Sequence, residues 1–186
     1  KDMKDTVDNS DLYKLITKQH DWSKSKTWYR NIINDIVDRA ENIRKLEISG
    51  GEPFINVHFD RLIDALLASG KELPGLNITT NGSFTEQQIQ KLEAFDHLHI
   101  NYSIDGSGKD FYEYLRWPLK WNEALEKIDI LKKYPWLTCE FAIVPHKLNI
   151  CNLADSIKCL KDFTDYLERF KVGFSWLNGA PWYKLD

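Results

Sequence analysis

Long apolar runs are missing from this sequence. No stretch of the chain approaches the roughly 20 consecutive apolar residues that a membrane-spanning helix requires, and no secretory signal opens it. We therefore expect a cytoplasmic protein that does not bind membranes.

An excess of one charge is missing as well. The chain carries 25 lysines and arginines against 28 aspartates and glutamates, and both signs are interspersed along its length. Such a chain has no basic footprint for nucleic acid or for an anionic membrane surface. We expect its partners to be small molecules or proteins.

Cysteine is scarce. The chain holds Cys139, Cys151 and Cys159, an odd number in a chain large enough to fold without disulfides, which indicates a reducing compartment. Cys139 falls on the apolar side of a predicted strand, and the other two lie eight positions apart, about 12 Å along a helix. We expect no metal site from these three, and buried, inert thiols at Cys139 and Cys159.

Residues 1–26 lack a sustained apolar period. Asp2, Asp5, Asp8 and Asp11 lie three apart, but the glycine and terminal glutamate of a calcium loop are missing. We expect a polar N-terminal arm over residues 1–26 and one domain over residues 27–186. The first residue is not methionine, so we expect a piece of a longer protein.

From residue 27 onward, strand and helix patterns alternate strictly. Helical periodicity is expected around residues 28–40, 59–67, 85–95, 121–131 and 153–167. Strand patterns cover residues 45–49, 76–80, 97–104, 137–144 and 171–177. This alternation predicts repeated βαβ units, and therefore an α/β fold with parallel strands.

The predicted strands are polar on one side only. In HLHINYSID, residues 97–105, His99, Asn101 and Ser103 alternate with apolar neighbours. A flat sheet covered on both faces, or a packed barrel, would be apolar on both sides. We predict a curved sheet with helices on its apolar face and a hydrated concave face. An antiparallel sheet with one wet side is the alternative.

Small and polar residues follow every predicted strand, where parallel strands present their carboxyl ends along one edge. Glycines there let a ligand approach the backbone. Carboxylates beside hydroxyls suit an ammonium group and a ribose diol better than a phosphate. The turns are SGGEP (49–53), TTNG (79–82), SIDGSGKD (103–110), VPHK (144–147) and WLNGAP (176–181).

The ordered combination LEISGGEP, LNITTNG and HINYSIDG resembles the radical S-adenosylmethionine (radical SAM) enzymes over roughly residues 27–182. The resemblance implies a parallel partial (β/α) barrel with an open polar lumen and S-adenosylmethionine as a cofactor. Within the family, the chain is most similar in its motifs to members that carry a C-terminal twitch or SPASM extension. Such an extension would begin beyond residue 186.

The resemblance further implies which residues bind the cofactor. The turn of Gly50, Gly51, Glu52 and Pro53 would surround the methionine ammonium group. Ser103 and Asp105 would lie near the ribose, with Thr80 or Asn81 beside them. Arg116, in FYEYLRWP, would pair with the methionine carboxylate; a surface salt bridge is the alternative for this arginine.

The sequence departs from this family in one respect. The family holds a [4Fe–4S] cluster with three thiolates of a CxxxCxxC loop after its first strand, and this chain contains no such motif. Either the first strand and the cluster loop lie upstream of residue 1, which we expect, or this relative has lost them. The cluster would then occur only in a longer form, and residues 1–26 would follow its loop.

In full, the resemblance implies an enzyme that takes an electron from a donor and reductively cleaves S-adenosylmethionine. The resulting 5′-deoxyadenosyl radical would abstract hydrogen from a small-molecule or peptide substrate, and this chain alone would be inactive. The alternative is a cluster-free module that binds a nucleotide, a small molecule or a protein. A third hypothesis is a different βα-barrel enzyme with Glu47, Glu140 and Lys171 in acid–base roles.

Overall fold

The structure, a computed structural model, describes residues 26–175, and only the backbone of residues 26–28. The chain divides into two compact units, Lys1–Arg39 and Ala40–Asp186. In the first unit, the described residues form helix α2 (Lys26–Asp38). Apart from Lys26, the predicted arm lies outside the described residues, and its boundary stays a prediction.

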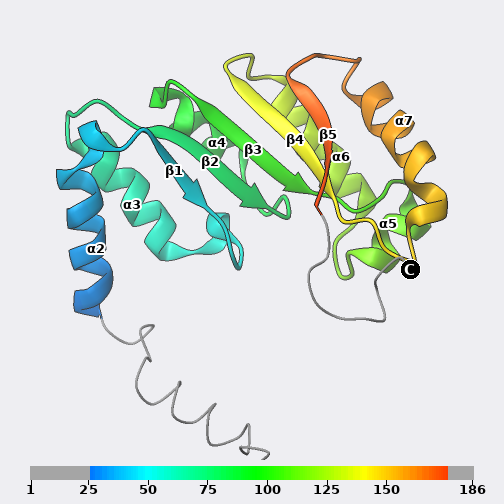
Figure 1. Ribbon diagram of the computed structural model, residues 1–186, viewed down its shortest axis with the longest axis horizontal. Coiled ribbons are helices and arrows are strands. Elements are labelled where there is room, and N and C mark those ends of the chain that lie inside the picture. Colours follow the sequence, from blue (N-terminus) through cyan, green and yellow to red (C-terminus); the bar gives the residue numbers. More distant parts are fainter. Residues whose placement is uncertain (1–25, 176–186) are drawn as a thin grey trace, which may run out of the picture. The chain divides into compact units, whose positions relative to one another are not determined.

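The second unit is built on a five-stranded parallel sheet whose strands lie side by side in chain order and point the same way (Figure 1). The parallel α/β fold is therefore confirmed, and the antiparallel alternative is wrong. The strands are β1 (Lys45–Ile48), β2 (Gly75–Thr80), β3 (Leu98–Ser103), β4 (Leu137–Ile143) and β5 (Phe170–Phe174).

Helices connect these strands. They are α3 (Val57–Ala68), α4 (Glu86–Lys91), α5 (Lys109–Leu115), α6 (Trp121–Lys132) and α7 (Leu153–Phe163), with short 3-10 turns η2 (Ala40–Asn42), η3 (Pro53–Ile55), η4 (Leu92–Ala94) and η5 (Ile150–Asn152). The sequence did not predict α5, because its seven residues are too few to show a helical period. Among residues 26–175, no helix is both long and apolar enough to cross a bilayer.

Helix α7 is shorter than its apolar pattern predicts. The pattern extends to Leu167, whereas the helix ends at Phe163, and Leu167 is 39% exposed. The Thr164 hydroxyl donates back to the Leu160 carbonyl oxygen at 3.0 Å, and Asp165 adopts a positive φ of 53°, which a helix does not tolerate.

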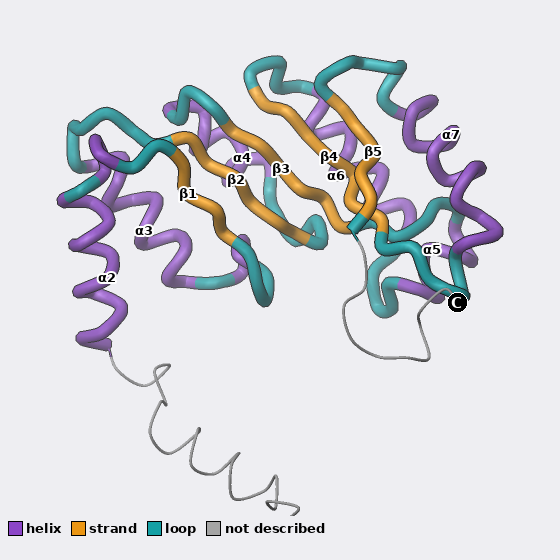
Figure 2. The backbone as a smooth tube through the Cα atoms, viewed as in Figure 1, coloured by secondary structure: helices purple, strands orange, loops and turns teal. Residues whose placement is uncertain are grey.

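The core lies between one face of the sheet and the helices; α4 and α6 are behind the strands in Figure 2. A row of ring contacts crosses this core, with centroids 5.3 to 6.3 Å apart, through Phe59, Phe54, Phe84, Tyr102, Phe141 and Phe170. The strand side chains on this face include Leu76, Ile78, Leu98, Ile100, Leu137, Cys139 and Ile143, each at most 2% exposed.

The opposite face of the sheet is polar, as the alternating pattern predicts. Asn101 Nδ2 donates to Asn77 Oδ1 at 2.9 Å, and His99 bridges Asn101 Oδ1 and Thr138 Oγ1 at 3.1 and 2.7 Å. We call this surface the polar face. It is formed by Lys45, Glu47, Asn77, Thr79, His99, Asn101, Ser103, Thr138, Glu140, Ala142, Lys171 and Gly173.

Gly82, in the turn after β2, lies close to the side chain of Tyr102. Gly82 has φ +96°, and a Cβ there would lie 2.6 Å from the Tyr102 hydroxyl. Gly70, after α3, also has a positive φ of 66°, but a Cβ there would meet nothing within 4 Å.

These two glycines make a matched pair of variants. We expect Gly70→Ala to lower the free energy of unfolding by about 1 kcal/mol, from backbone strain alone. Gly82→Ala adds the overlap with Tyr102 and should cost at least about 3 kcal/mol. Urea unfolding of both variants measures the difference, and equal losses would contradict the contact.

The cysteines differ in burial. Cys139 is buried as predicted, whereas Cys159 is half-buried and not buried as expected; Cys151 is exposed. Burial strongly raises the pKa of the Cys139 thiol, so the thiol stays protonated at neutral and mildly alkaline pH.

Alkylation should follow this order. With iodoacetamide at pH 8, we expect Cys151 to react first, Cys159 next, and Cys139 only after unfolding, because the reagent needs an accessible thiolate. Peptide mass spectrometry over time gives the three rates. Native-state labelling of Cys139 as fast as that of Cys151 would show that this core is open.

Candidate functional site

The turn after β1 leaves its backbone accessible. Gly50 and Gly51 have φ of +93° and +59°, and a Cβ at either position would meet nothing within 4 Å. These glycines are therefore required by the backbone conformation and not by crowding. The described residues leave the space beside these two glycines open.

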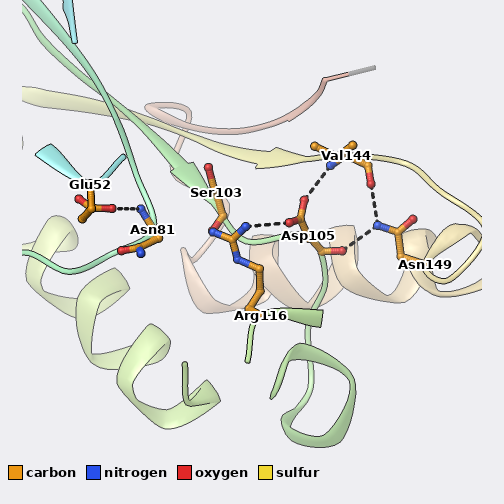
Figure 3. Close-up of polar contacts among 7 residues, drawn as sticks. All are labelled: Glu52, Asn81, Ser103, Asp105, Arg116, Val144 and Asn149. Atoms are coloured by element: carbon orange, nitrogen blue, oxygen red, sulfur yellow. Dashed lines mark hydrogen bonds and ion pairs between the residues drawn. The ribbon is translucent and has the colours of Figure 1, made fainter. Parts of the chain in front are cut away.

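Glu52 ties this turn to the end of the neighbouring strand (Figure 3). Its Oε1 accepts a hydrogen bond from Thr80 Oγ1 at 2.6 Å, and its Oε2 accepts one from the Asn81 backbone N–H at 2.7 Å. Pro53 begins the 3-10 turn that Glu52 caps. The predicted residues Gly50, Gly51, Glu52, Pro53, Thr80 and Asn81 thus form one cluster.

Asp105 organises a second cluster, after β3. It adopts a positive φ of 56°, a conformation that aspartate tolerates better than most residues. Its Oδ1 accepts from the Val144 backbone N–H and its Oδ2 accepts from Arg116 Nη1, both at 2.9 Å. Arg116 Nη2 donates to the Ser103 carbonyl oxygen at 2.9 Å, so three segments meet at this carboxylate (Figure 3).

Arg116 therefore forms an ion pair, as the alternative interpretation had it, but not on the surface. The side chains of Arg116 and Asp105 are only 20% and 15% exposed. The contacts predicted for Asp105 with ribose and for Arg116 with the methionine carboxylate stay predictions.

Asn149 is a site residue that the sequence did not indicate. It is fully buried, and its Nδ2 donates to the backbone oxygens of Asp105 and Val144 at 3.0 and 2.8 Å. Its Oδ1 accepts from the His146 backbone N–H at 2.8 Å. An asparagine in a turn is ordinary in sequence, and only the fold shows that this one joins two turns.

The two clusters occupy the carboxyl ends of neighbouring strands, and Figure 3 shows Ser103 between Asn81 and Asp105. Ser103 lies at the end of β3 on the polar face. Within the described residues, its hydroxyl donates no hydrogen bond to another side chain or to the backbone. We call this edge, formed by residues 49–53, 80–83, 103–108 and 144–149, the rim.

The largest described cavity shares residues 81–83 with the rim but lies on its helical side. It has a volume of about 430 Å³ and is bounded by residues 81–85 and the first half of α6, with Tyr102 and Tyr112 in its wall. Burial raises the pKa of both phenols. Of the predicted site residues, only Asn81 lines this cavity.

The acid–base hypothesis finds no support in this arrangement. Glu140 and Lys171 are paired in register on β4 and β5, but Glu47 lies three strands away, or about 14 Å at ordinary strand spacing. Glu47 is paired with Lys45 at 2.5 Å, and this contact lowers its pKa.

The residues of this chain do not fit a [4Fe–4S] cluster. Such a cluster needs three converging thiolates, and the printed sequence has no CxxxCxxC motif. Within residues 26–175, no three histidine, cysteine, aspartate or glutamate side chains come together in a way that could hold a metal ion.

Removing the Asp105 carboxylate should destabilise the rim. Asp105→Ala leaves Arg116 without its partner in a half-buried position and leaves the Val144 N–H without an acceptor, at an expected cost of about 3 kcal/mol. Asp105→Asn, which keeps an acceptor for Val144, is the control and should cost less. In urea unfolding, additive losses in Asp105→Ala/Arg116→Ala would contradict the coupling.

Comparisons with known proteins bear on this arrangement. A protein of Methanococcus maripaludis described as "Probable GTP 3',8-cyclase" is 26% identical over 127 residues, 68% of this chain and 40% of that protein. The mycofactocin maturase MftC of Mycolicibacterium smegmatis is 25% identical over 122 residues, 64% of this chain and 30% of its own length. The chain thus spans less than half of either relative.

A solved structure shares the fold. The structure titled "Native anSMEcpe with bound AdoMet" superposes with a TM-score of 0.58 at 18% identity, covering 80% of this chain and 41% of that one. The partial (β/α) barrel is therefore confirmed. A sequence model described as "Radical SAM superfamily" matches residues 15–160. This match covers most of the chain and all four turns of the rim, so the chain belongs to the radical SAM superfamily.

Proposed function

We propose that this chain forms the S-adenosylmethionine-binding part of a radical SAM enzyme that acts on a small-molecule or peptide substrate. The observation that carries the proposal is the turn after β1. Its open glycine backbone is held by Glu52 against Thr80 and Asn81, at the edge of a polar sheet face.

The turn suits the methionine ammonium group. No atom of the described residues lies within 4 Å of a Cβ built on Gly50 or Gly51, so these residues leave the backbone of this turn open to a ligand. The Glu52 carboxylate accepts hydrogen bonds from Thr80 Oγ1 and Asn81 N, and the lone pairs of two carboxylate oxygens can accept further donors. A positively charged amine supplies such donors.

The second cluster suits the rest of the ligand. The Ser103 hydroxyl is available for a ribose hydroxyl or a carboxylate. The Arg116 guanidinium has five N–H donors, and the described residues accept from Nη1 and Nη2. We propose that a remaining N–H binds the methionine carboxylate, while Asp105 fixes the orientation of the guanidinium.

When bound to a reduced [4Fe–4S] cluster, S-adenosylmethionine supplies a 5′-deoxyadenosyl radical that abstracts hydrogen from a substrate. The residues of this chain bind and orient the cofactor and hold the substrate over the polar face. The proposal assigns the cluster to residues outside the printed sequence, and it requires a separate electron donor.

A second candidate function is a cluster-free binding module for S-adenosylmethionine or a related nucleoside. The observation that favours it is that the rim is ordered by its own contacts in a chain whose described residues bring no three metal-ligating side chains together. Both candidates predict the same binding site. They differ in whether the full-length protein is coloured by an iron–sulfur cluster and cleaves S-adenosylmethionine on reduction.

Titration of the chain with S-adenosylmethionine tests the shared site. We expect amide shifts in NMR spectra at Gly50, Gly51, Asn81 and Ser103, with millimolar affinity. Glu52→Gln should weaken binding about tenfold, because the ammonium group loses a charged acceptor.

Two controls make this test specific. Glu47→Gln, on the same sheet face, should bind like the wild type. 5′-Methylthioadenosine lacks the amino-acid part, so Glu52→Gln should leave its affinity unchanged if the variant merely loses the ammonium contact. No shifts at about 5 mM S-adenosylmethionine, or equal losses for both ligands, would reject the proposed site.

A further inference from the structure

Glu140 is a carboxylate of the polar face that has no charged partner among residues 26–175. It lies in the middle of β4 and is half-buried. In the part of the chain that the structure describes, its carboxylate accepts no hydrogen bond and forms no ion pair. A charge in such a position is costly unless a partner compensates it.

The glycine on the neighbouring strand determines where this carboxylate lies. A Cβ added to Gly173 would overlap Oε1, Cδ and Cγ of Glu140. Ala142 pairs with Gly173, and Glu140 pairs with Lys171. The carboxylate therefore leans toward Gly173, which is about 6.6 Å nearer the rim than Lys171, and away from the lysine.

The neighbour on the other side does not compensate the charge either. Asn101, the partner of Glu140 on β3, donates Nδ2 to Asn77 and accepts from His99 with Oδ1. The Asn101 amide thus bonds to Asn77 and His99 and forms no hydrogen bond with Glu140. Glu140 is left as an unpaired acceptor that points toward the rim.

We propose that Glu140 selects a substrate with a cationic group, an ammonium or a guanidinium. This inference rests on the proposed function, in which the substrate lies over the polar face, and it adds the charge of that substrate. The cation would lie between Glu140 and the level of Ser103 and Ala142, which pair one step closer to the rim. A lysine or arginine side chain of a peptide, or a free amine, has this chemistry.

Matched probes test the proposal. Nα-acetyl-lysine methylamide carries an ammonium group, and Nα-acetyl-norleucine methylamide has the same backbone without one. In NMR titrations of the 186-residue chain, we expect the lysine probe to shift the amides of Glu140, Ala142 and Gly173 and to bind at least about fivefold more tightly. Glu140→Gln should abolish this preference, whereas Glu47→Gln should retain it.

Gly173→Ala is a second variant, which keeps the carboxylate but fills the space that it occupies. It should weaken the preference for the lysine probe while the remaining spectrum stays that of the wild type. Equal binding of both probes at concentrations up to about 20 mM, or a preference that survives in Glu140→Gln, would overturn the proposal. Failure of the proposed function is distinguishable, because it removes the S-adenosylmethionine shifts at Gly50, Gly51 and Asn81.

Discussion

A parallel sheet that leaves one face uncovered must satisfy the polar side chains of that face within the sheet itself. Here the strand side chains on the other face are buried against the helices. On the polar face, Asn77, Asn101, His99 and Thr138 bond to one another across three strands. This network orders the surface and leaves few groups for a ligand. Among the described residues of this face, the side chains of Thr79, Ser103, Glu140 and Lys171 form no hydrogen bond or ion pair, and Ser103 and Glu140 are the two of these that lie in the middle or at the rim end of the central strands.

Two carboxylates of the rim support the fold and are also candidates for binding. Glu52 joins the turn after β1 to the end of β2, and Asp105 joins the turn after β3 to Val144 and Arg116. These roles are compatible, because a carboxylate already fixed by protein donors loses little further freedom when a ligand binds. The contacts that order the rim thus also orient these two carboxylates.

Local patterns in the sequence predicted what depends on local geometry. The alternation in HLHINYSID predicts β3 and its polar side, because side chains in a strand alternate with a period of two. The same reasoning cannot predict the role of Asn149, because its partners Asp105 and Val144 become neighbours only in the folded sheet. The ion pair of Asp105 and Arg116 likewise depends on helix α5, which is too short to be predicted. Of the candidate site, the sequence therefore indicated the residues of the turns after β1, β2 and β3, but neither Asn149 nor the bonds between these residues.

Buried aromatic contacts lie under two turns of the rim. Phe54 follows the turn after β1 directly, is 3% exposed, and packs against Phe59 and Phe84. Phe84 in turn packs against Tyr102, so the turns after β1 and β2 rest on one buried aromatic row. These contacts, and the bonds of Glu52 above them, all lie within the described residues, so this part of the sheet positions the turn that we propose for S-adenosylmethionine. A radical enzyme and a cluster-free binding module would therefore share this rim, and would differ only in the chemistry brought to it.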